Sequence, residues 1–316
     1  MPKLIHRVTT VVRRVADAAQ GVRTFELADP EDWALPPFTA GAHIDVHIPN
    51  GAVRQYSLYG DPAEGNRYRI AVRREDDGRG GSVAMHCDIG EGTILPVSLP
   101  RNHFPLREGR RHFLIAGGIG ITPLLSMMSV LRRTQASFEL HYCSRTPLET
   151  AFLPELRSFA ANGDIHHYFS RAADPRRFDI GGLLARVPAD AQVYCCGPRS
   201  LIEAVMSSGS AALADRIHVE FFGIAGREAR PDYVVELSRS RRIIAVAQGE
   251  TMLNALREAG VDLPSSCEGG VCLECKTRFL DGVPVHRDLV MSVADRQHHL
   301  TPCVSSCAGG RLVLDL

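Results

Sequence analysis

The sequence predicts a multidomain protein in which an all-β domain is followed by a doubly wound α/β domain and a smaller cysteine-rich domain. Up to about residue 105, short apolar or alternating runs are separated by Gly, Pro and Asp, as between closely spaced strands. Beyond that point, buried strand-like runs alternate with helical runs, which is typical of a parallel sheet. Five of the nine cysteines lie in the last 50 residues. We therefore expect domains at residues 1–105, 106–224 and 225–316.

The charge and cysteine distributions exclude several classes of protein. Thirty-six basic residues balance 36 acidic ones, so the strongly positive surface of a nucleic-acid-binding protein is not expected. No apolar run reaches the roughly 18 residues of a membrane span, and the first residues lack the apolar core of a signal peptide. We expect a cytoplasmic protein with no nucleic-acid or membrane partner. An odd number of cysteines crowded into one segment favours metal ligation over disulfides.

The first domain contains several short runs with the alternation of half-buried strands. A barrel is the natural closure for so many short strands, and only one helix is indicated, beginning near Ser82. The expected strands cover residues 22–27, 43–48, 54–59 and 68–74.

The second domain begins with a short buried strand, a glycine-rich turn and a helical run. The pattern then repeats along the chain, and residues 223–232, rich in Gly, Pro and charge, suit a linker to the third domain. In the second domain, strands are expected at residues 112–117, 138–144, 164–170, 191–197 and 218–223, and helices at 124–133, 154–161, 181–187 and 200–209. In the third domain, strands are expected at residues 233–239 and 241–248, and a helix at 251–260.

The cysteines Cys267, Cys272 and Cys275 follow the spacing C-x4-C-x2-C, with a fourth cysteine downstream at Cys303 or Cys307. This is the spacing of plant-type [2Fe–2S] sites. Glycines 269 and 270 allow the sharp bend that three thiolates within nine residues require, and they let backbone amides approach the sulfurs. The alternatives are a zinc site, which prefers paired short spacings, or reduced structural thiols. Spacing alone leaves the choice between the two downstream cysteines open.

Three further segments have the composition of anion and ring-binding sites. Residues 54–57 (RQYS) place an arginine and a tyrosine on one face of an expected strand, although a plain surface strand would look the same. Residues 78–82 (GRGGS) open an expected helix, where backbone amides can hold a phosphate, or they form a simple glycine-rich turn. Residues 114–123 (LIAGGIGITP) follow a strand and precede a helix that Thr122 could cap. We find no Ser/His/Asp or paired-carboxylate arrangement, and we expect His166 and His167 on the surface or in a loop.

The cysteine segment, together with residues 302–305 (PCVS) and the ending LVLDL, resembles the C-terminal ferredoxin domain of the phthalate dioxygenase reductase family. That family includes the reductases of vanillate O-demethylases. The resemblance implies a β-grasp domain and assigns the fourth cluster ligand to Cys303, leaving Cys307 as a bystander. Leu273 departs from the family, which usually has Gly or Ser at this position.

The RQYS and GRGGS segments, in this order, resemble the flavin site of the ferredoxin reductase superfamily. The resemblance implies a ferredoxin-reductase-like barrel that binds FMN rather than FAD, because the GRGGS form goes with FMN in this branch. The implied flavin-binding residues are Arg54, Gln55, Tyr56, Ser57, Arg79, Gly80, Gly81, Ser82 and Asn102.

The glycine-rich loop at residues 117–123 resembles the GGxGxTP loop of the same superfamily, which binds a nicotinamide dinucleotide. Cys196 is then expected beside the nicotinamide and Phe222 near the flavin ring. NADH is the family's usual donor, although Arg171 could instead pair with the 2′-phosphate of NADPH. The implied nucleotide-binding residues are Gly118, Gly120, Thr122, Ser144, Arg145, Arg171, Cys196 and Phe222.

Together these resemblances imply an NAD(P)H-dependent flavin iron–sulfur oxidoreductase without a catalytic side chain of its own. The expected role is the reductase component of a two-component oxygenase, passing electrons through FMN and a [2Fe–2S] cluster to a terminal Rieske oxygenase that acts on an aromatic compound by demethylation or dihydroxylation. The alternatives are a reductase for a cytochrome P450 or another haem or iron acceptor, and a zinc-containing binding module. We expect a monomer.

Overall fold

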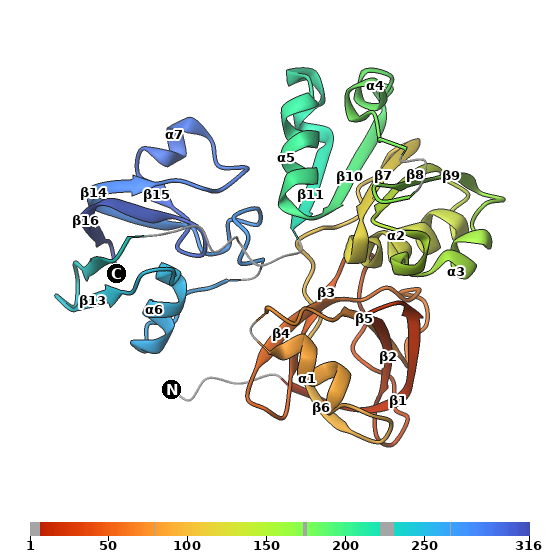
Figure 1. Cartoon of the computed structure of the whole chain (residues 1–316), viewed down its shortest axis with the longest axis horizontal. Helices are drawn as coiled ribbons and strands as arrows, with labels where there is room; N and C mark the ends of the chain where they lie inside the picture. Colours follow the sequence, from red (N-terminus) through yellow and green to blue (C-terminus); the bar gives the residue numbers. More distant parts are fainter. Residues whose placement is uncertain (1–6, 79, 173–175, 222–230, 266) are drawn as a thin grey trace. The chain divides into compact units, whose positions relative to one another are not determined.

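The computed structural model describes residues 7–78, 80–172, 176–221, 231–265 and 267–316 (Figure 1). The chain divides into two compact units, Met1–Val219 and Glu220–Leu316. The first unit carries an antiparallel sheet and a parallel sheet, and the second unit carries a mixed sheet. No helix in the described ranges is long and apolar enough to cross a membrane.

The antiparallel sheet has six strands in the order β4-β3-β6-β1-β2-β5. The backbone amide of Tyr59, just after β4, donates to the carbonyl of Arg69 on β5 at 3.0 Å, so the two outer strands meet and the sheet closes into a barrel. The strands are β1 (Arg7–Ala19), β2 (Val22–Ala28), β3 (His43–His47), β4 (Val53–Ser57), β5 (Tyr68–Arg73) and β6 (Ile94–Ser98).

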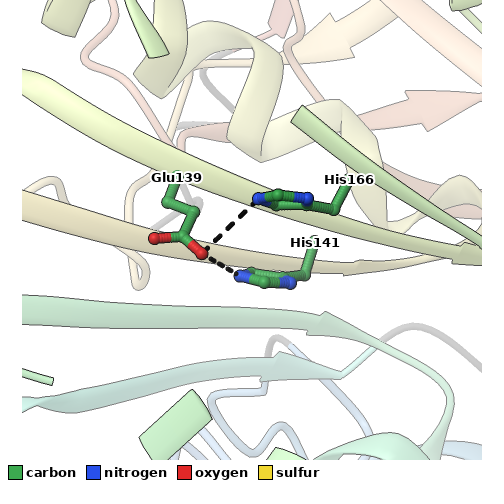
Figure 2. A group of neighbouring side chains, drawn as sticks. All are labelled: Glu139, His141 and His166. Atoms are coloured by element: carbon green, nitrogen blue, oxygen red, sulfur yellow. Dashed lines mark hydrogen bonds and ion pairs between the residues drawn. The ribbon is translucent and has the colours of Figure 1, made fainter. Parts of the chain in front are cut away.

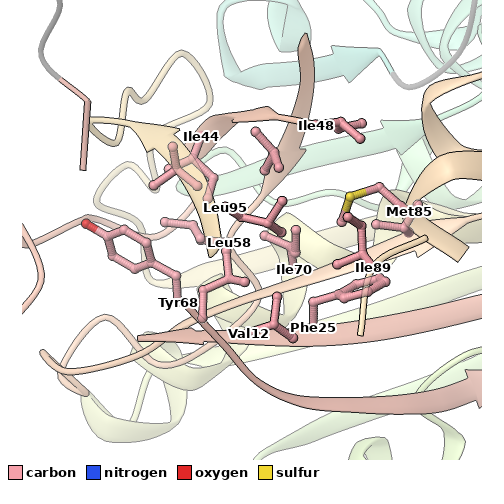
Figure 3. Packing of buried hydrophobic residues seen from close by; sticks show 14 of the residues in the cluster. Val12, Phe25, Ile44, Ile48, Leu58, Tyr68, Ile70, Met85, Ile89 and Leu95 are labelled. Atoms are coloured by element: carbon pink, nitrogen blue, oxygen red, sulfur yellow. The ribbon is translucent and has the colours of Figure 1, made fainter. Parts of the chain in front are cut away.

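The barrel interior is filled by aliphatic and aromatic side chains from every strand (Figure 3). Phe25, Ile44, Leu58 and Ile70 have no exposed surface. Helix α1 (Gly81–Cys87) contributes Met85 to the same cluster, so the start of this helix is held against the barrel by apolar packing.

The parallel sheet has the order β11-β10-β7-β8-β9, with parallel pairing between β10 and β7, β7 and β8, and β8 and β9. Because β7 is flanked by β8 on one side and β10 on the other, the direction of chain winding reverses beside it, which marks the usual nucleotide crevice of such folds. The elements are β7 (Arg111–Gly117), α2 (Ile121–Arg133), β8 (Ser137–Ser144), α3 (Leu153–Arg157), β9 (Gly163–Phe169), α4 (Ile180–Ala185), β10 (Ala191–Gly197), α5 (Arg199–Ser208) and β11 (Ile217–Phe221).

The sheet of the second unit is mixed, in the order β13-β12-β16-β14-β15. Strands β12 and β16 pair in parallel, and the β13–β12, β16–β14 and β14–β15 pairs are antiparallel. Helix α6 begins after Thr251, whose side-chain oxygen accepts from the Asn254 amide at 3.2 Å. The elements are β12 (Tyr233–Leu237), β13 (Ile243–Val246), α6 (Met252–Glu258), β14 (Thr277–Val285), α7 (Val293–Arg296), β15 (His299–Leu300) and β16 (Ser306–Leu314).

These elements confirm the expected fold class of a β-barrel, a doubly wound α/β domain and a β-grasp-like domain, with differences in detail. Strands β6, β14, β15 and β16 and helix α7 were not expected. The long first strand β1 was not expected, because register shifts between Val12 and Arg14 and between Asp17 and Ala19 interrupt its alternation. The helix expected at 154–161 ends at Arg157 and continues as tight turns. Most of the expected linker lies outside the described residues, and the boundaries 105/106 and 224/225 remain predictions.

Candidate functional site

The barrel brings together two segments that resemble a flavin site but lie 27 residues apart in sequence. Arg54 lies on β4, and its side chain crosses directly over Gly81 at the start of α1. A Cβ placed on Gly81 would lie 2.6 Å from Nε of Arg54, so only glycine lets the guanidinium approach this backbone. Gly80 has a left-handed φ of 74°. A cation and a tight glycine backbone thus lie together, which suits a phosphate.

Tyr56 and Ser57 continue the same strand toward the barrel. Tyr56 lies on the same face as Arg54, as the pairing of Tyr56 with Ile44 and of Arg54 with Val46 requires. Burial raises the pKa of the Tyr56 phenol, while Arg54 opposes that change. The hydroxyl of Ser57 is buried and has no hydrogen-bond partner in the described part of the chain. An orphaned buried hydroxyl beside a half-buried tyrosine fits a ring with polar edges.

Two other residues expected at the flavin have their polar groups engaged within the protein. The Ser82 hydroxyl accepts from the Glu75 amide at 3.0 Å and thereby ties the turn to α1. The Asn102 side-chain amide donates to Thr39 Oγ1 at 2.7 Å and to the Ala40 carbonyl at 2.9 Å, so it holds a loop in place. Arg79 lies outside the described residues. Flavin contacts of this group remain predictions.

The glycine-rich loop at residues 117–123 packs closely against the backbone at the end of β10. A Cβ on Gly120 would lie 2.3 Å from the carbonyl oxygen of Cys196 on β10, and one on Gly197 would lie 2.9 Å from Cα of Gly117. Gly118 has a left-handed φ of 55°, and the position of its missing Cβ is 3.7 Å from a guanidinium nitrogen of Arg73 on the barrel strand β5. The loop, the end of β10 and the barrel therefore converge on one region.

The expectation that Thr122 caps the following helix is wrong. Helix α2 begins at Ile121, two residues earlier than a Thr122 cap would place it, with Gly120 at its N-cap and no side-chain cap. The Thr122 hydroxyl instead donates to the Ile119 carbonyl at 3.0 Å and is buried. The first-turn amides of α2 consequently have no side-chain cap, which suits a dinucleotide phosphate.

The remaining nucleotide-site residues lie at the carboxyl ends of three parallel strands. Ser144 ends β8, and its hydroxyl lies 2.6 Å from that of Thr150, while Arg145 follows it and is exposed. Arg171 follows β9 closely and is also exposed. Cys196 lies near the end of β10 and is fully buried. Phe222 lies outside the described residues.

Four cysteines converge in the second unit as two pairs of sulfurs. The Sγ atoms of Cys275 and Cys303 are 3.3 Å apart, and both side chains are buried. The Cys272 thiol hydrogen-bonds to Cys267 and, with backbone amides, lowers the pKa of Cys267 to about 6 against the opposing effect of burial. The amides of Gly269 and Cys272 each donate to the Cys267 sulfur at 3.4 Å. Four thiols in two pairs fit two irons.

Cys307 is not part of this group. It lies on β16 in the hydrophobic core of the second unit, with 1% of its surface exposed, and its Sγ donates to the Arg311 carbonyl at 3.1 Å. Its contacts are those of a small apolar core residue. This geometry supports Cys303 over Cys307 as the fourth ligand.

The cysteine loop contains strained backbone and packs against the buried carboxylate residue Asp288, which pairs with Arg296. Leu273, at the position where the family has a small residue, has a left-handed φ of 58°, and Gly270 has a φ of 75°. The carboxylate of Asp288 is fully buried, accepts from Arg296 at 2.9 Å, and a Cβ on Gly270 would lie 2.9 Å from Cα of Asp288. Sequence reasoning missed this support because neither Asp288 nor Arg296 belongs to a motif.

The other four thiols differ widely in accessibility. Cys87 is exposed, Cys143 is half-buried, and Cys195 and Cys196 are buried. Burial raises the pKa of Cys143 to about 12 and also raises that of Cys195.

A second group of titratable side chains, Glu139, His141 and His166, lies on neighbouring strands β8 and β9 (Figure 2). Glu139 accepts from His141 at 2.9 Å, from Arg111 at 3.1 Å and from two nitrogens of Arg186. Both carboxylate oxygens are therefore engaged by guanidinium groups, and the group is an ion-pair network within the sheet. Glu139 lies near the amino end of β8, and His141 and His166 lie in the middle of β8 and β9. His166 is exposed, as expected, whereas His167 is half-buried, and both lie on strand β9.

The titration of this network follows from its burial. Burial alone would raise the pKa of Glu139, but the hydrogen bond and charge of Arg186, with help from His141, lower it to about 2. Burial lowers the pKa of His141 to about 4, against the opposing charge of Glu139. His141 is thus neutral at pH 7.

Comparison with known proteins identifies two of the three parts directly. Residues 114–207 match the oxidoreductase NAD-binding domain, and residues 235–308 match the 2Fe-2S iron-sulfur cluster binding domain. The first match covers the glycine-rich loop and the end of β10, and the second covers all four proposed ligands.

Similarity to individual proteins extends over nearly the whole chain. The phthalate 4,5-dioxygenase oxygenase reductase subunit of Pseudomonas putida is 44% identical over 307 residues, covering 95% of this chain and 94% of that protein. The haem-dependent oxidative N-demethylase beta subunit of Ectopseudomonas mendocina is 42% identical, covering 89% and 90%. The solved phthalate dioxygenase reductase, described as a modular structure for electron transfer from pyridine nucleotides to [2Fe-2S], superposes with a TM-score of 0.79 at 40% identity, covering 98% of both chains.

The protein is accordingly an oxidoreductase that uses NADH, FMN and a [2Fe–2S] cluster and supplies electrons to an oxygenase component. The residues present fit these cofactors: Gly80 and Gly81 beside Arg54 fit the FMN phosphate, the glycine-rich loop after β7 fits the dinucleotide, and the paired thiols fit the cluster. Identity at this level over the full length, with the cluster and nucleotide domains in the same order, shows that the chain belongs to the phthalate dioxygenase reductase family.

Proposed function

We propose that the oxygenase served by this chain is a Rieske enzyme that demethylates or dihydroxylates an aromatic compound. The observation that carries the proposal is the 44% identity, over nearly the full length, to the reductase subunit of a phthalate 4,5-dioxygenase, whose named substrate is an aromatic acid. A plant-type cluster near about −400 mV is also reducing enough for a Rieske centre at roughly −150 mV or above. We propose that the reductase works as a monomer in the cytoplasm.

The residue assignment follows the three parts of the chain. In residues 1–105, Arg54 with the backbone of Gly80 and Gly81 holds the flavin phosphate, and Tyr56 and Ser57 line the ring. In residues 106–224, the loop at Gly118 and Gly120 presents the α2 amides to the dinucleotide pyrophosphate. In residues 225–316, the ligands are Cys267, Cys272, Cys275 and Cys303.

The order of these sites has a chemical reason. A hydride carries two electrons whereas a [2Fe–2S] cluster accepts one, and a bound flavin accepts the pair and releases the electrons singly. The protein needs no acid–base dyad for this transfer, so its side chains orient the rings and exclude water. The close packing of Gly120 against Cys196 serves that purpose, because it fixes the backbone beside the nicotinamide position.

A haem-containing oxygenase is the second candidate for the partner. The observation that favours it is the 42% identity to the beta subunit of a haem-dependent oxidative N-demethylase, covering 89% of this chain. The difference between the two candidates lies in the partner and not in the chemistry of this chain.

The test begins with anaerobic addition of NADH to the purified holoprotein. Flavin and iron–sulfur absorbance should bleach together, and iron and acid-labile sulfide should be equimolar, whereas a colourless zinc protein would refute the assignment. The reduced protein is then mixed rapidly with a purified phthalate-type Rieske oxygenase or with the haem component of an oxidative N-demethylase. The proposal predicts faster reduction of the Rieske centre, and preferential reduction of the haem would replace it by the second candidate. Light scattering after size exclusion measures the mass.

A further inference from the structure

Two arginine side chains lie at the carboxyl ends of neighbouring strands, on the β8 side of the nucleotide crevice. Arg145 directly follows β8, and Arg171 lies two residues after the end of β9. The backbone pairing of the sheet continues through them, because the amide of Ser170 donates to the Ser144 carbonyl at 3.0 Å and that of Arg171 to the Arg145 carbonyl at 2.9 Å. The two side chains therefore start from adjacent points of a rigid backbone.

Neither guanidinium is paired within the residues that the structure describes. Both residues are exposed, and within the described ranges neither guanidinium has a hydrogen bond or ion pair. Other arginines of this α/β domain behave differently, since Arg111 on β7 and Arg186 after α4 are both paired with Glu139. The two side chains leave adjacent backbone positions, and two cations that come close together repel each other unless an anion lies between them.

The position of these cations relative to the crevice decides which part of the dinucleotide they meet. The crevice opens between β7 and β10. On the β10 side Cys196, Gly197 and Pro198 are uncharged, and Arg199, two residues after the strand, is already paired with Glu203 at 2.7 Å. The strand next to β7 on the other side is β8, followed by β9. In dinucleotide folds the adenosine ribose lies toward this second strand, where a carboxylate binds the 2′-hydroxyl of NADH and an arginine accommodates the 2′-phosphate of NADPH.

The described residues that immediately follow β8 and β9 fit a 2′-phosphate better than a ribose hydroxyl. They are Arg145 and Thr146 after β8, and Ser170, Arg171 and Ala172 after β9, so they offer hydroxyl and guanidinium groups and no carboxylate. A guanidinium binds a phosphate through two parallel N–H bonds, which a ribose hydroxyl cannot use. Asp174 lies outside the described residues.

We propose that Arg145 and Arg171 bind the 2′-phosphate of NADPH, so that this reductase accepts NADPH as well as NADH. The inference rests on the proposed electron route, because it concerns the same nucleotide crevice. It makes Arg171 a specificity-determining residue, and it assigns the phosphate to the junction of the β8 and β9 ends.

The experiment measures kcat/KM of the FMN- and cluster-loaded protein for NADH and NADPH, with cytochrome c as the acceptor. We expect the NADPH value to lie within about tenfold of the NADH value, and Arg171→Ala to lower the NADPH-to-NADH ratio by at least about tenfold, the effect of losing one charged hydrogen-bonding group. Arg171→Glu should lower the ratio further because it adds repulsion. A wild-type NADPH value below about a hundredth of the NADH value would overturn the proposal.

Arg157 provides the matched control. It is an exposed arginine without a partner in the described ranges, at the end of α3, where the chain returns toward the amino ends of the strands. Arg157→Ala should leave the ratio unchanged, and an equal effect of both variants would mean that only general surface charge acts.

A binding measurement separates this inference from the proposed function. Under the proposal 2′,5′-ADP should inhibit NADH oxidation at a concentration at least about tenfold lower than 5′-ADP, and Arg171→Ala should abolish the difference. Equal inhibition by the two nucleotides would overturn the 2′-phosphate site. If neither NADH nor NADPH reduced the flavin, the proposed electron route would fail, while direct binding of the two nucleotides by calorimetry would still decide the phosphate site.

Discussion

Replacing Cys303 and Cys307 separately should distinguish a cluster ligand from a core residue four positions away. In Cys303→Ala the partner sulfur of Cys275, now 3.3 Å away, loses its neighbour, and only three thiolates remain for a site that needs four. We expect this variant to retain little iron or acid-labile sulfide and to lose visible absorbance from the cluster, while the flavin absorbance stays.

The effect of Cys307→Ala should appear in stability instead. The substitution removes one buried sulfur, about the size of a methylene group, together with the weak hydrogen bond to the Arg311 carbonyl. Loss of roughly 0.8 kcal/mol of burial plus a small cavity gives about 1–2 kcal/mol for the unit Glu220–Leu316. Cluster content per chain should equal that of the wild type.

The assays are iron and sulfide analysis, visible absorption, and low-temperature electron paramagnetic resonance after dithionite reduction, with urea unfolding for the stability difference. Flavin content in each sample controls for general misfolding. Loss of the cluster in Cys307→Ala with retention in Cys303→Ala would refute the assignment, and loss in both would show that the core around β16 is needed to form the loop.

Three further changes test other parts of the structure. Leu273→Gly should raise the stability of the second unit to urea by about 1 kcal/mol, because glycine adopts the left-handed backbone conformation at this position without steric cost. Leu273→Ala keeps that cost, so equal urea midpoints for the two variants would contradict the strain. Gly120→Ala forces a Cβ to 2.3 Å from the Cys196 carbonyl and should lower kcat/KM for NADH by about 100-fold with FMN retained, as steady-state kinetics and the flavin spectrum would measure. The pKa of His141 is about 4 in the folded protein and near 6.5 in the unfolded protein, so the free energy of unfolding should fall by about 3 kcal/mol as the pH falls from 6.5 to 4. Glu139 adds a further loss of stability between pH 4.5 and 2. Urea midpoints plotted against pH should be flatter in His141→Gln.

The sequence predicted those parts of the site that depend on local spacing. Three ligands lie within nine residues, so Cys267, Cys272 and Cys275 could be recognised directly, and the glycine-rich loop after β7 follows from its strand and helix context. The fourth ligand could not be chosen from spacing, because spacing does not show whether the side chain of Cys303 or that of Cys307 faces the ligand loop rather than the core. Family resemblance chose Cys303, and the burial of Cys307 in the core supports that choice.

Features that depend on long-range packing could not be predicted. The contact of Arg54 with Gly81 arises from barrel closure, which no local pattern encodes. The support of Gly270 by Asp288 likewise joins residues 18 apart without a motif. Thr122 looked like a cap because Thr is common at N-caps, but the helix has its N-cap at Gly120 and therefore starts two residues earlier. Tertiary packing decides such boundaries.

The unequal exposure of the thiols makes this reductase suitable for site-specific labelling without cysteine removal. Once four sulfurs bind iron and Cys195, Cys196 and Cys307 are buried, only Cys87 combines exposure with a thiol that a maleimide can reach readily, because the raised pKa of Cys143 suppresses its thiolate. Cys87 ends helix α1 on the flavin barrel. A fluorophore or spin label attached there could report the distance between the two compact units during turnover, in the native sequence and with the cluster intact.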